Sequence, residues 1–136
     1  MTTLREATLV RIHVPVRPGT LEVMLAGDPA AAEGDPVLAA MLGLIREGGV
    51  LGDFGLYTGV VEIAPGWESF CSGPDATPTL GSAGEASLSP TVILTTYAAC
   101  APDDPALLAM VERLLAAHPW EIPVIEVAPT RLAWRG

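Results

Sequence analysis

Four stretches of the chain are predicted to be strands, and in the first two of them apolar and polar residues alternate with the period of two that indicates one buried face. These stretches are residues 8–16, 57–64, 91–99 and 122–128. The third reads TVILTTYAA, and such an apolar, β-branched run is typical of a strand in the centre of a sheet. Pro15 and Pro65 are expected to end the first and second strands.

Two other stretches repeat apolar residues at the spacing of an amphipathic helix. Each begins with Asp-Pro, at 35–36 and at 104–105, where the aspartate can cap the helix and the proline suits its first position. Gly48-Gly49 and His118-Pro119 are expected to end them. The predicted buried stripes are Leu38, Met41, Leu42 and Ile45 in the first helix, and Leu107, Leu108, Val111, Leu114 and Leu115 in the second.

Two stretches rich in Gly and Pro are expected to be long connections within a single domain spanning residues 1–136. Residues 17–34 form one of them, and a helical turn is considered within it near residues 20–25. Residues 65–90 form the other. Because this second stretch carries Trp67, Phe70 and Leu80, it is too apolar for a solvated tether, and we expect an ordered excursion or a hairpin.

The predicted elements give strand–helix–strand twice, and the two helices begin alike, with DPVLAAM at 35–41 and DPALLAM at 104–110. This repeat predicts an α+β fold, the ferredoxin-like βαββαβ plait, with both helices on one face of an antiparallel sheet. A mixture of polar and apolar side chains on the other face suggests a subunit interface; the alternatives are an ordinary solvated face or an acid/base set. That face would carry Arg11, His13, Glu62, Ile93, Thr95, Tyr97 and Glu126.

Composition narrows the possible partners. Half of the 136 residues are hydrophobic, which excludes intrinsic disorder. The net charge is −9 and all seven basic residues are arginines, so we expect no nucleic-acid partner and no anionic membrane surface. We find neither a membrane-spanning run nor a signal peptide, and expect a cytoplasmic bacterial protein in which Cys71 and Cys100 are free thiols.

His118, Trp120 and Glu121 form the most suggestive cluster of side chains. An imidazole and a carboxylate beside an aromatic ring could bind a small polar ligand or a single metal ion. In the structural alternative, His118 satisfies the last carbonyls of the helix and Trp120 packs under the edge of the sheet. A site with two histidines would require His13 to approach.

Two groups of motifs resemble the inserted domain of YqfO-type proteins, a dimetal-site family whose middle domain is a CutA/PII-like ferredoxin plait. LLAAHPWEIPVIEV at 114–127 is similar to that domain's helix, H-P-Y-E-x-P motif and strand. Three earlier motifs are similar to other parts of that domain and occur in the family's order. They are GVLGDFGLY at 49–57, GWESF at 66–70 and ATPTLGSAGE at 76–85. The resemblance implies a freestanding CutA/PII-like module. The family's His-Cys pair falls on Gly59 and Val60, so chemistry that depends on it is not implied.

We therefore expect a non-catalytic, homo-oligomeric module of the CutA/YqfO-insert type, a dimer or trimer that binds a small ligand or acts as a regulator. Aromatic walls with a few polar groups suit a small-molecule pocket. The alternatives are a divalent-cation-binding protein that uses His118 and Glu121, and a small enzyme with His118 as its acid/base. No catalytic residue and no cofactor is assigned. The candidate ligand-binding residues are Tyr57, Trp67, Phe70, His118, Trp120 and Glu121.

Overall fold

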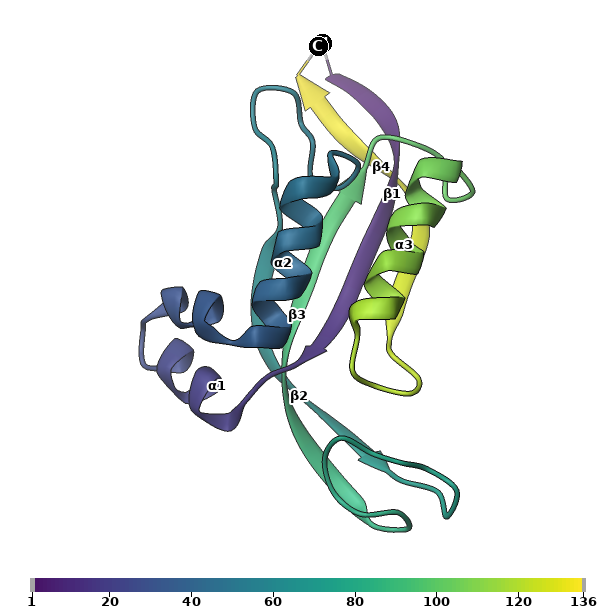
Figure 1. Ribbon diagram of the computed structural model, residues 1–136. Coiled ribbons are helices and arrows are strands. Elements are labelled where there is room, and N and C mark those ends of the chain that lie inside the picture. The colour runs from purple at the N-terminus through teal and green to yellow at the C-terminus, as the bar shows by residue number, and fades with distance from the viewer. Residues whose placement is uncertain (1, 136) are drawn as a thin grey trace.

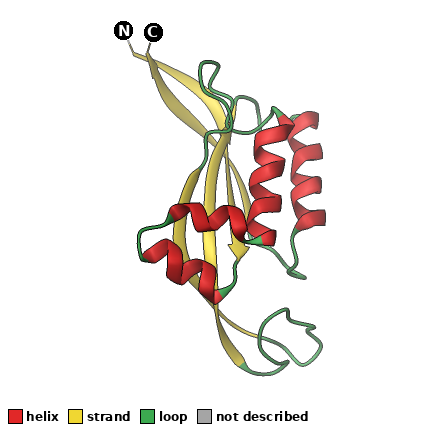
Figure 2. Cartoon of the chain, turned by 60° about the vertical axis from the view of Figure 1, so that its left-hand side comes forward, coloured by secondary structure: helices red, strands yellow, loops and turns green. Residues whose placement is uncertain are grey.

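The computed structural model describes residues 2–135, which form an α+β, ferredoxin-like βαββαβ plait. The four strands make one antiparallel sheet in the order β2-β3-β1-β4, and α2 and α3 cover one face of it (Figures 1 and 2). The fold class predicted from the repeat is therefore confirmed. The elements are β1 (Thr2–Pro15), α1 (Pro18–Leu25), the 3₁₀ helix η1 (Pro29–Gly34), α2 (Pro36–Gly48), β2 (Glu62–Cys71), β3 (Ala86–Ala98), α3 (Pro105–Ala117) and β4 (Ile125–Arg135).

The core lies between the two long helices and the inner strands β1 and β3. All four residues of the stripe predicted for α2 are fully buried, as are Val10, Ile12 and Val14 of β1. In α3 the buried residues are Leu107, Met110 and Leu114. The prediction was wrong for Leu108 and Leu115, which are about half exposed, because α3 buries only a narrow stripe and these two residues lie beside it.

Asp35 explains how the first half of the chain is held together. Its buried carboxylate accepts hydrogen bonds from the backbone N–H groups of Val37 and Leu38 at the start of α2. The same carboxylate accepts bonds from the Arg17 N–H and the Thr20 hydroxyl, both at 2.9 Å, which ties the start of α1 to the start of α2. Asp104 caps α3 by a single bond from the Ala106 N–H.

Both expected long connections are more regular than predicted. Residues 17–34 contain α1 and η1, and the helical turn considered near 20–25 belongs to α1. Within 65–90, β2 continues as far as Cys71 and β3 already starts at Ala86, so this stretch is a hairpin with its loop at 72–85. Pro65 does not end the second strand, because β2 is an edge strand and an edge tolerates proline.

The strand bounds differ from the predicted ones at several further places. β1 begins at Thr2 rather than at residue 8, and β4 continues to Arg135 rather than ending at residue 128. β2 begins at Glu62 rather than at Tyr57, and β4 begins at Ile125 rather than at Ile122. Residues 49–61 are mostly loop, and the end of that loop leads into β2. The hairpin of β2 and β3 extends beyond the helices at one end of the molecule, as Figure 1 shows.

The register places the expected residues together on the face of the sheet opposite the helices. Glu62 pairs with Thr95, Thr95 with Arg11, and Arg11 with Glu126, so these four side chains cross the sheet as one row. The Arg11 guanidinium donates to the Glu126 carboxylate at 2.7 Å. This pairing fits an ion-pair network better than an acid/base set, because Glu126 already has a cationic partner.

The two ends of the described chain meet at one corner of the sheet. Thr2 and Arg135 are cross-strand partners in the β1–β4 pair, and Figure 1 shows both termini at the same place. None of the helices between residues 2 and 135 has the length and apolar character to cross a membrane.

Candidate functional site

A cavity of about 400 Å³ lies where the β2–β3 hairpin meets the loop that follows α3. Two aromatic residues and two carboxylates face it from these two separate segments of the chain. We call it the hairpin cavity. Its lining residues are Glu68, Phe70, Cys71, Ser72, Gly73, Ala76, Pro78, Thr79, Trp120, Glu121 and Ile122.

Local structure explains how these side chains come together. Residues two apart in a strand point to the same side, so β2 presents Glu68 and Phe70 together while Trp67 points to the opposite side. α3 ends at Ala117 with His118 as its C-cap, and Pro119 prevents the helix from continuing. The chain therefore turns and brings Trp120 and Glu121 to the cavity.

His118 holds this turn in place rather than facing a ligand. Its buried ring donates from Nε2 to the His13 carbonyl at 2.7 Å and accepts at Nδ1 from the Trp120 N–H at 3.1 Å. We assign the neutral tautomer with hydrogen on Nε2, because Nδ1 must keep a lone pair to accept. Burial lowers the pKa of His118, although the His13 carbonyl and the Glu68 carboxylate act in the opposite direction. The structural interpretation of His118 thus describes its contacts better than a ligand or acid/base role.

The stability of the protein is expected to decrease as the pH falls below about 6.5, the ordinary pKa of histidine. The folded state lowers the pKa of His118, so the unfolded chain takes up this proton more readily. The stabilisation is therefore complete above about pH 6.5 and is lost progressively on acidification. Urea unfolding of the wild type and of His118→Gln across this range checks the prediction. Since Gln does not titrate, the two pH profiles should diverge, and parallel profiles would contradict the assignment.

Two acidic side chains of the hairpin cavity differ in their partners. Glu121 accepts a hydrogen bond from the Thr77 N–H, which fastens the 72–85 loop to the turn after α3. The Oε2 atom of Glu68 is buried and has no hydrogen-bond donor among the described residues. The Nδ1 atom of the His13 ring lies 3.7 Å from this oxygen, beyond hydrogen-bond distance.

The structure brings together four of the six residues expected to bind a ligand. Phe70, Trp120 and Glu121 line the hairpin cavity, and the ring of His118 lies behind Trp120, with 5.3 Å between the ring centroids. Trp67 is separated from them because it is exposed on the other side of β2. Tyr57 is also exposed, in the loop between α2 and β2, which lies at the opposite end of the sheet in Figure 1.

Sequence analysis missed Glu68 as a member of this site. The residue follows Pro65-Gly66, which was interpreted as the end of a strand, so its alternation with Phe70 was not considered. Continuing the period-two pattern through Gly66 would have placed Glu68 and Phe70 on one side. The other missed lining residues belong to the 72–79 loop, where no periodicity exists to predict their direction.

Metal ligands are sparse in the described part of the chain. Between residues 2 and 135, no three His, Cys, Asp or Glu side chains gather closely enough to hold an ion. Both ring nitrogens of His118 are engaged, and Glu121 bonds to a backbone N–H. Cys71, whose thiol is free, lines the hairpin cavity, whereas Cys100 is free and half-buried elsewhere.

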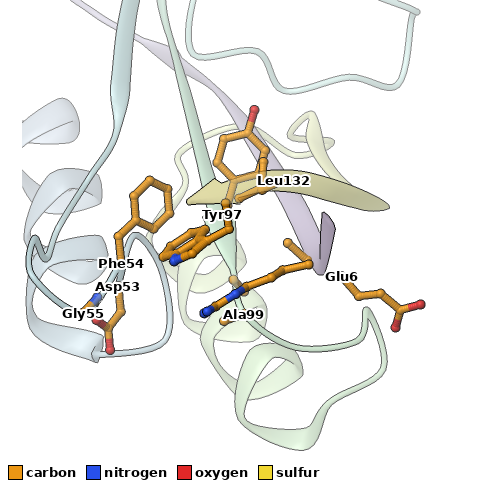
Figure 3. A pocket seen from close by; sticks show the side chains of 11 residues that line it. Glu6, Asp53, Phe54, Gly55, Tyr97, Ala99 and Leu132 are labelled. Atoms are coloured by element: carbon orange, nitrogen blue, oxygen red, sulfur yellow. Dashed lines mark hydrogen bonds between the residues drawn. The ribbon is translucent and has the colours of Figure 1, made fainter. Parts of the chain in front are cut away.

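A smaller hollow of about 260 Å³ lies at the other end of the sheet. Figure 3 shows Phe54 and Tyr97 at this hollow, with the carboxylate of Glu6 pointing away from the rings. Phe54 packs edge-on against Trp134, and the Arg5 guanidinium lies 4.7 Å from the centre of the Trp134 ring. These contacts pack the 51–61 loop against the ends of β1 and β4, so we regard this hollow as a packing cluster.

Comparison with known proteins supports the fold and leaves the function open. No protein-family model matches the chain, and no curated protein matches it either. Among solved structures it is similar to a Bacillus cereus protein related to NIF3, with a TM-score of 0.59 and 16% sequence identity. The match covers 94% of this chain and 26% of the other, so this chain spans about a quarter of that protein's length. At this identity the likeness shows a shared fold.

Proposed function

We propose that this chain is a non-catalytic, homo-oligomeric module of the CutA/YqfO-insert type that binds a small ligand in the hairpin cavity. One observation carries the proposal: aromatic rings and carboxylates from two distant segments converge on a single open cavity of about 400 Å³. Small-molecule sites have this size and this mixture of apolar walls with few polar groups. The fold shared with the NIF3-related protein supports the kinship.

The contacts of His118 argue against the two alternative functions. A divalent-cation site that uses His118 needs a free imidazole nitrogen on that ring, and both nitrogens of His118 already form hydrogen bonds. An acid/base role needs a ring that reaches substrate and exchanges protons near neutral pH. The ring of His118 is buried behind Trp120 and its pKa is lowered. A binding module uses Trp120 and Phe70 directly and needs no proton transfer.

A fragment library screened by saturation-transfer NMR tests the cavity as a binding site. We expect fragments that bind the wild type to lose about tenfold or more in affinity with Trp120→Ala, because that variant removes one aromatic wall. Phe70→Ala should behave in the same way. Tyr57→Ala is the matched control, since Tyr57 is an exposed aromatic residue outside the cavity. Fragments that bind all variants equally, or an absence of binding fragments, would contradict the proposal.

The oligomer that we propose uses the exposed apolar side of the hairpin. Trp67 and Leu88 are 57% and 61% exposed, and the register places them as diagonal neighbours on the same side of β2 and β3. Adjacent large apolar residues on a projecting hairpin mark a surface for self-association. By the same register, Ile93 and Tyr97 lie on the opposite, open face of the sheet and are not part of this surface.

Light scattering coupled to size-exclusion chromatography tests this assembly. We expect the light-scattering mass of the wild type to be two or three times the chain mass of 14.1 kDa. A double variant, Trp67→Arg with Leu88→Arg, should elute as a monomer because a buried guanidinium pair opposes contact. Leu56→Arg is the control, since Leu56 is 94% exposed in the distant loop. A monomeric wild type, or a double variant that still assembles, would refute this part of the proposal.

A further inference from the structure

The buried Glu68 oxygen points to the chemical class of the ligand. A buried polar atom without a partner is uncommon in folded proteins and costs about 1–3 kcal/mol, more when the group is charged. Glu68 Oε2 is such an atom, and Glu68 lines the hairpin cavity. The His13 ring is 3.7 Å away and therefore does not supply the missing hydrogen bond. The Glu68 side chain as a whole is 28% exposed, so it can turn toward the cavity and accept a hydrogen bond from a ligand with an N–H donor.

The remaining lining of the cavity favours positive charge. Its eleven lining residues include Glu68 and Glu121 and, within this described set, neither arginine nor lysine. Trp120 and Phe70 are also among them, and the face of an aromatic ring attracts a cation. Pro78 and Ile122 add apolar surface for a hydrocarbon group. The negative charge of the two carboxylates, the aromatic rings and the unpaired oxygen of Glu68 therefore all favour a cationic ligand.

We propose that the hairpin cavity binds a small organic cation, a protonated amine on an apolar scaffold, whose N–H donates to Glu68. This inference rests on the proposed function. A bare divalent ion fits less well, because the two carboxylates and the Cys71 thiol that line the cavity do not gather into a three-ligand group within residues 2–135. A quaternary ammonium also fits less well, because it has no N–H to offer the buried oxygen.

Three probes of similar shape isolate the contribution of charge. Calorimetry on the full chain compares 2-phenylethylamine, 2-phenylethanol and 3-phenylpropionate, which are cationic, neutral and anionic at pH 7. We expect the amine to bind about tenfold or more tighter than the alcohol, and the carboxylate not to bind measurably. The aromatic ring of each probe meets the same apolar walls, so the differences report the charged end.

Glu68→Gln is the deciding variant, because it keeps the shape of the side chain and removes its charge. It should lower the affinity of the amine about tenfold, to that of the alcohol, and leave the affinity of the alcohol unchanged. Glu62→Gln is the matched control: Glu62 is an exposed carboxylate of the same strand and lies outside the cavity. Thermal unfolding of both variants confirms that they are folded.

The outcomes separate this inference from the proposed function. Equal affinities of the amine and the alcohol for the wild type would overturn the organic-cation assignment while the cavity remains a binding site. Equal loss of amine binding with Glu68→Gln and Glu62→Gln would overturn it as well, because a general charge effect would explain the result. If none of the three probes binds, the organic-cation assignment is also overturned. The fragment screen then tests separately whether the cavity is a binding site.

Discussion

Replacing Asp35 by alanine is expected to lower the free energy of unfolding by about 4 kcal/mol. The buried carboxylate accepts four hydrogen bonds: two from backbone N–H groups of α2, one from the Arg17 N–H and one from the Thr20 hydroxyl. Alanine would leave the three backbone donors without partners, and the Leu38 N–H among them is buried. Urea unfolding followed by helical circular dichroism measures the loss.

Asp104→Ala provides the matched control, because the sequence repeats Asp-Pro at the start of α3. Asp104 makes one capping bond, at 3.0 Å to the Ala106 N–H, and lies at a less buried position. Its removal is expected to cost about 1 kcal/mol, the usual contribution of a helix cap. Equal losses in the two variants would show that the bonds from Arg17 and Thr20 add nothing to the cap.

Gly52→Ala is the second substitution with a large expected effect, about 3 kcal/mol or more of lost stability. Gly52 has a φ of +70°, which side-chain-bearing residues rarely adopt. A Cβ there would lie 2.5 Å from the Val60 carbonyl oxygen and 2.6 Å from the Val60 nitrogen. The backbone has little freedom to relax, since the Gly52 N–H donates to the Tyr97 carbonyl and its own carbonyl accepts from Val60.

Gly55→Ala distinguishes the close contact from the backbone conformation. Gly55 has a similar φ of +79°, and a Cβ there would meet open space. We therefore expect it to cost about 1 kcal/mol, the conformational part alone. Thermal unfolding of both variants measures the difference, and equal shifts in melting temperature would contradict the role assigned to the Val60 contact.

The core of the fold was predictable because its elements have clear periods. The stripe of α2 and the alternation of Val10, Ile12 and Val14 each indicate one buried face, and the structure buries those residues. α1 was not predicted with the same clarity because its apolar residues are not sorted onto one face. Leu21 is buried, whereas Val23 and Leu25 of the same short helix are about half exposed.

The candidate site was predictable only where local sequence determines direction. Trp120 and Glu121 were identified because they stand beside His118 in the sequence, and Pro119 makes the chain leave the helix there, which brings both to the cavity. Glu68 was missed because an edge strand continued through Pro65-Gly66. Tyr57 and Trp67 were grouped with the others as aromatic residues, but residue type alone does not show which end or side of a sheet a ring occupies.

The pairing of Thr2 with Arg135 makes this plait suitable for circular permutation, in which the chain ends are joined and the chain is opened elsewhere. Cross-strand partners have their Cα atoms about 5 Å apart, so a linker of a few residues would join the ends while β1 and β4 stay paired. The chain can then be reopened in the 72–85 loop to give a circular permutant. A host protein can likewise carry such a plait within one surface loop, because its entry and exit points almost coincide.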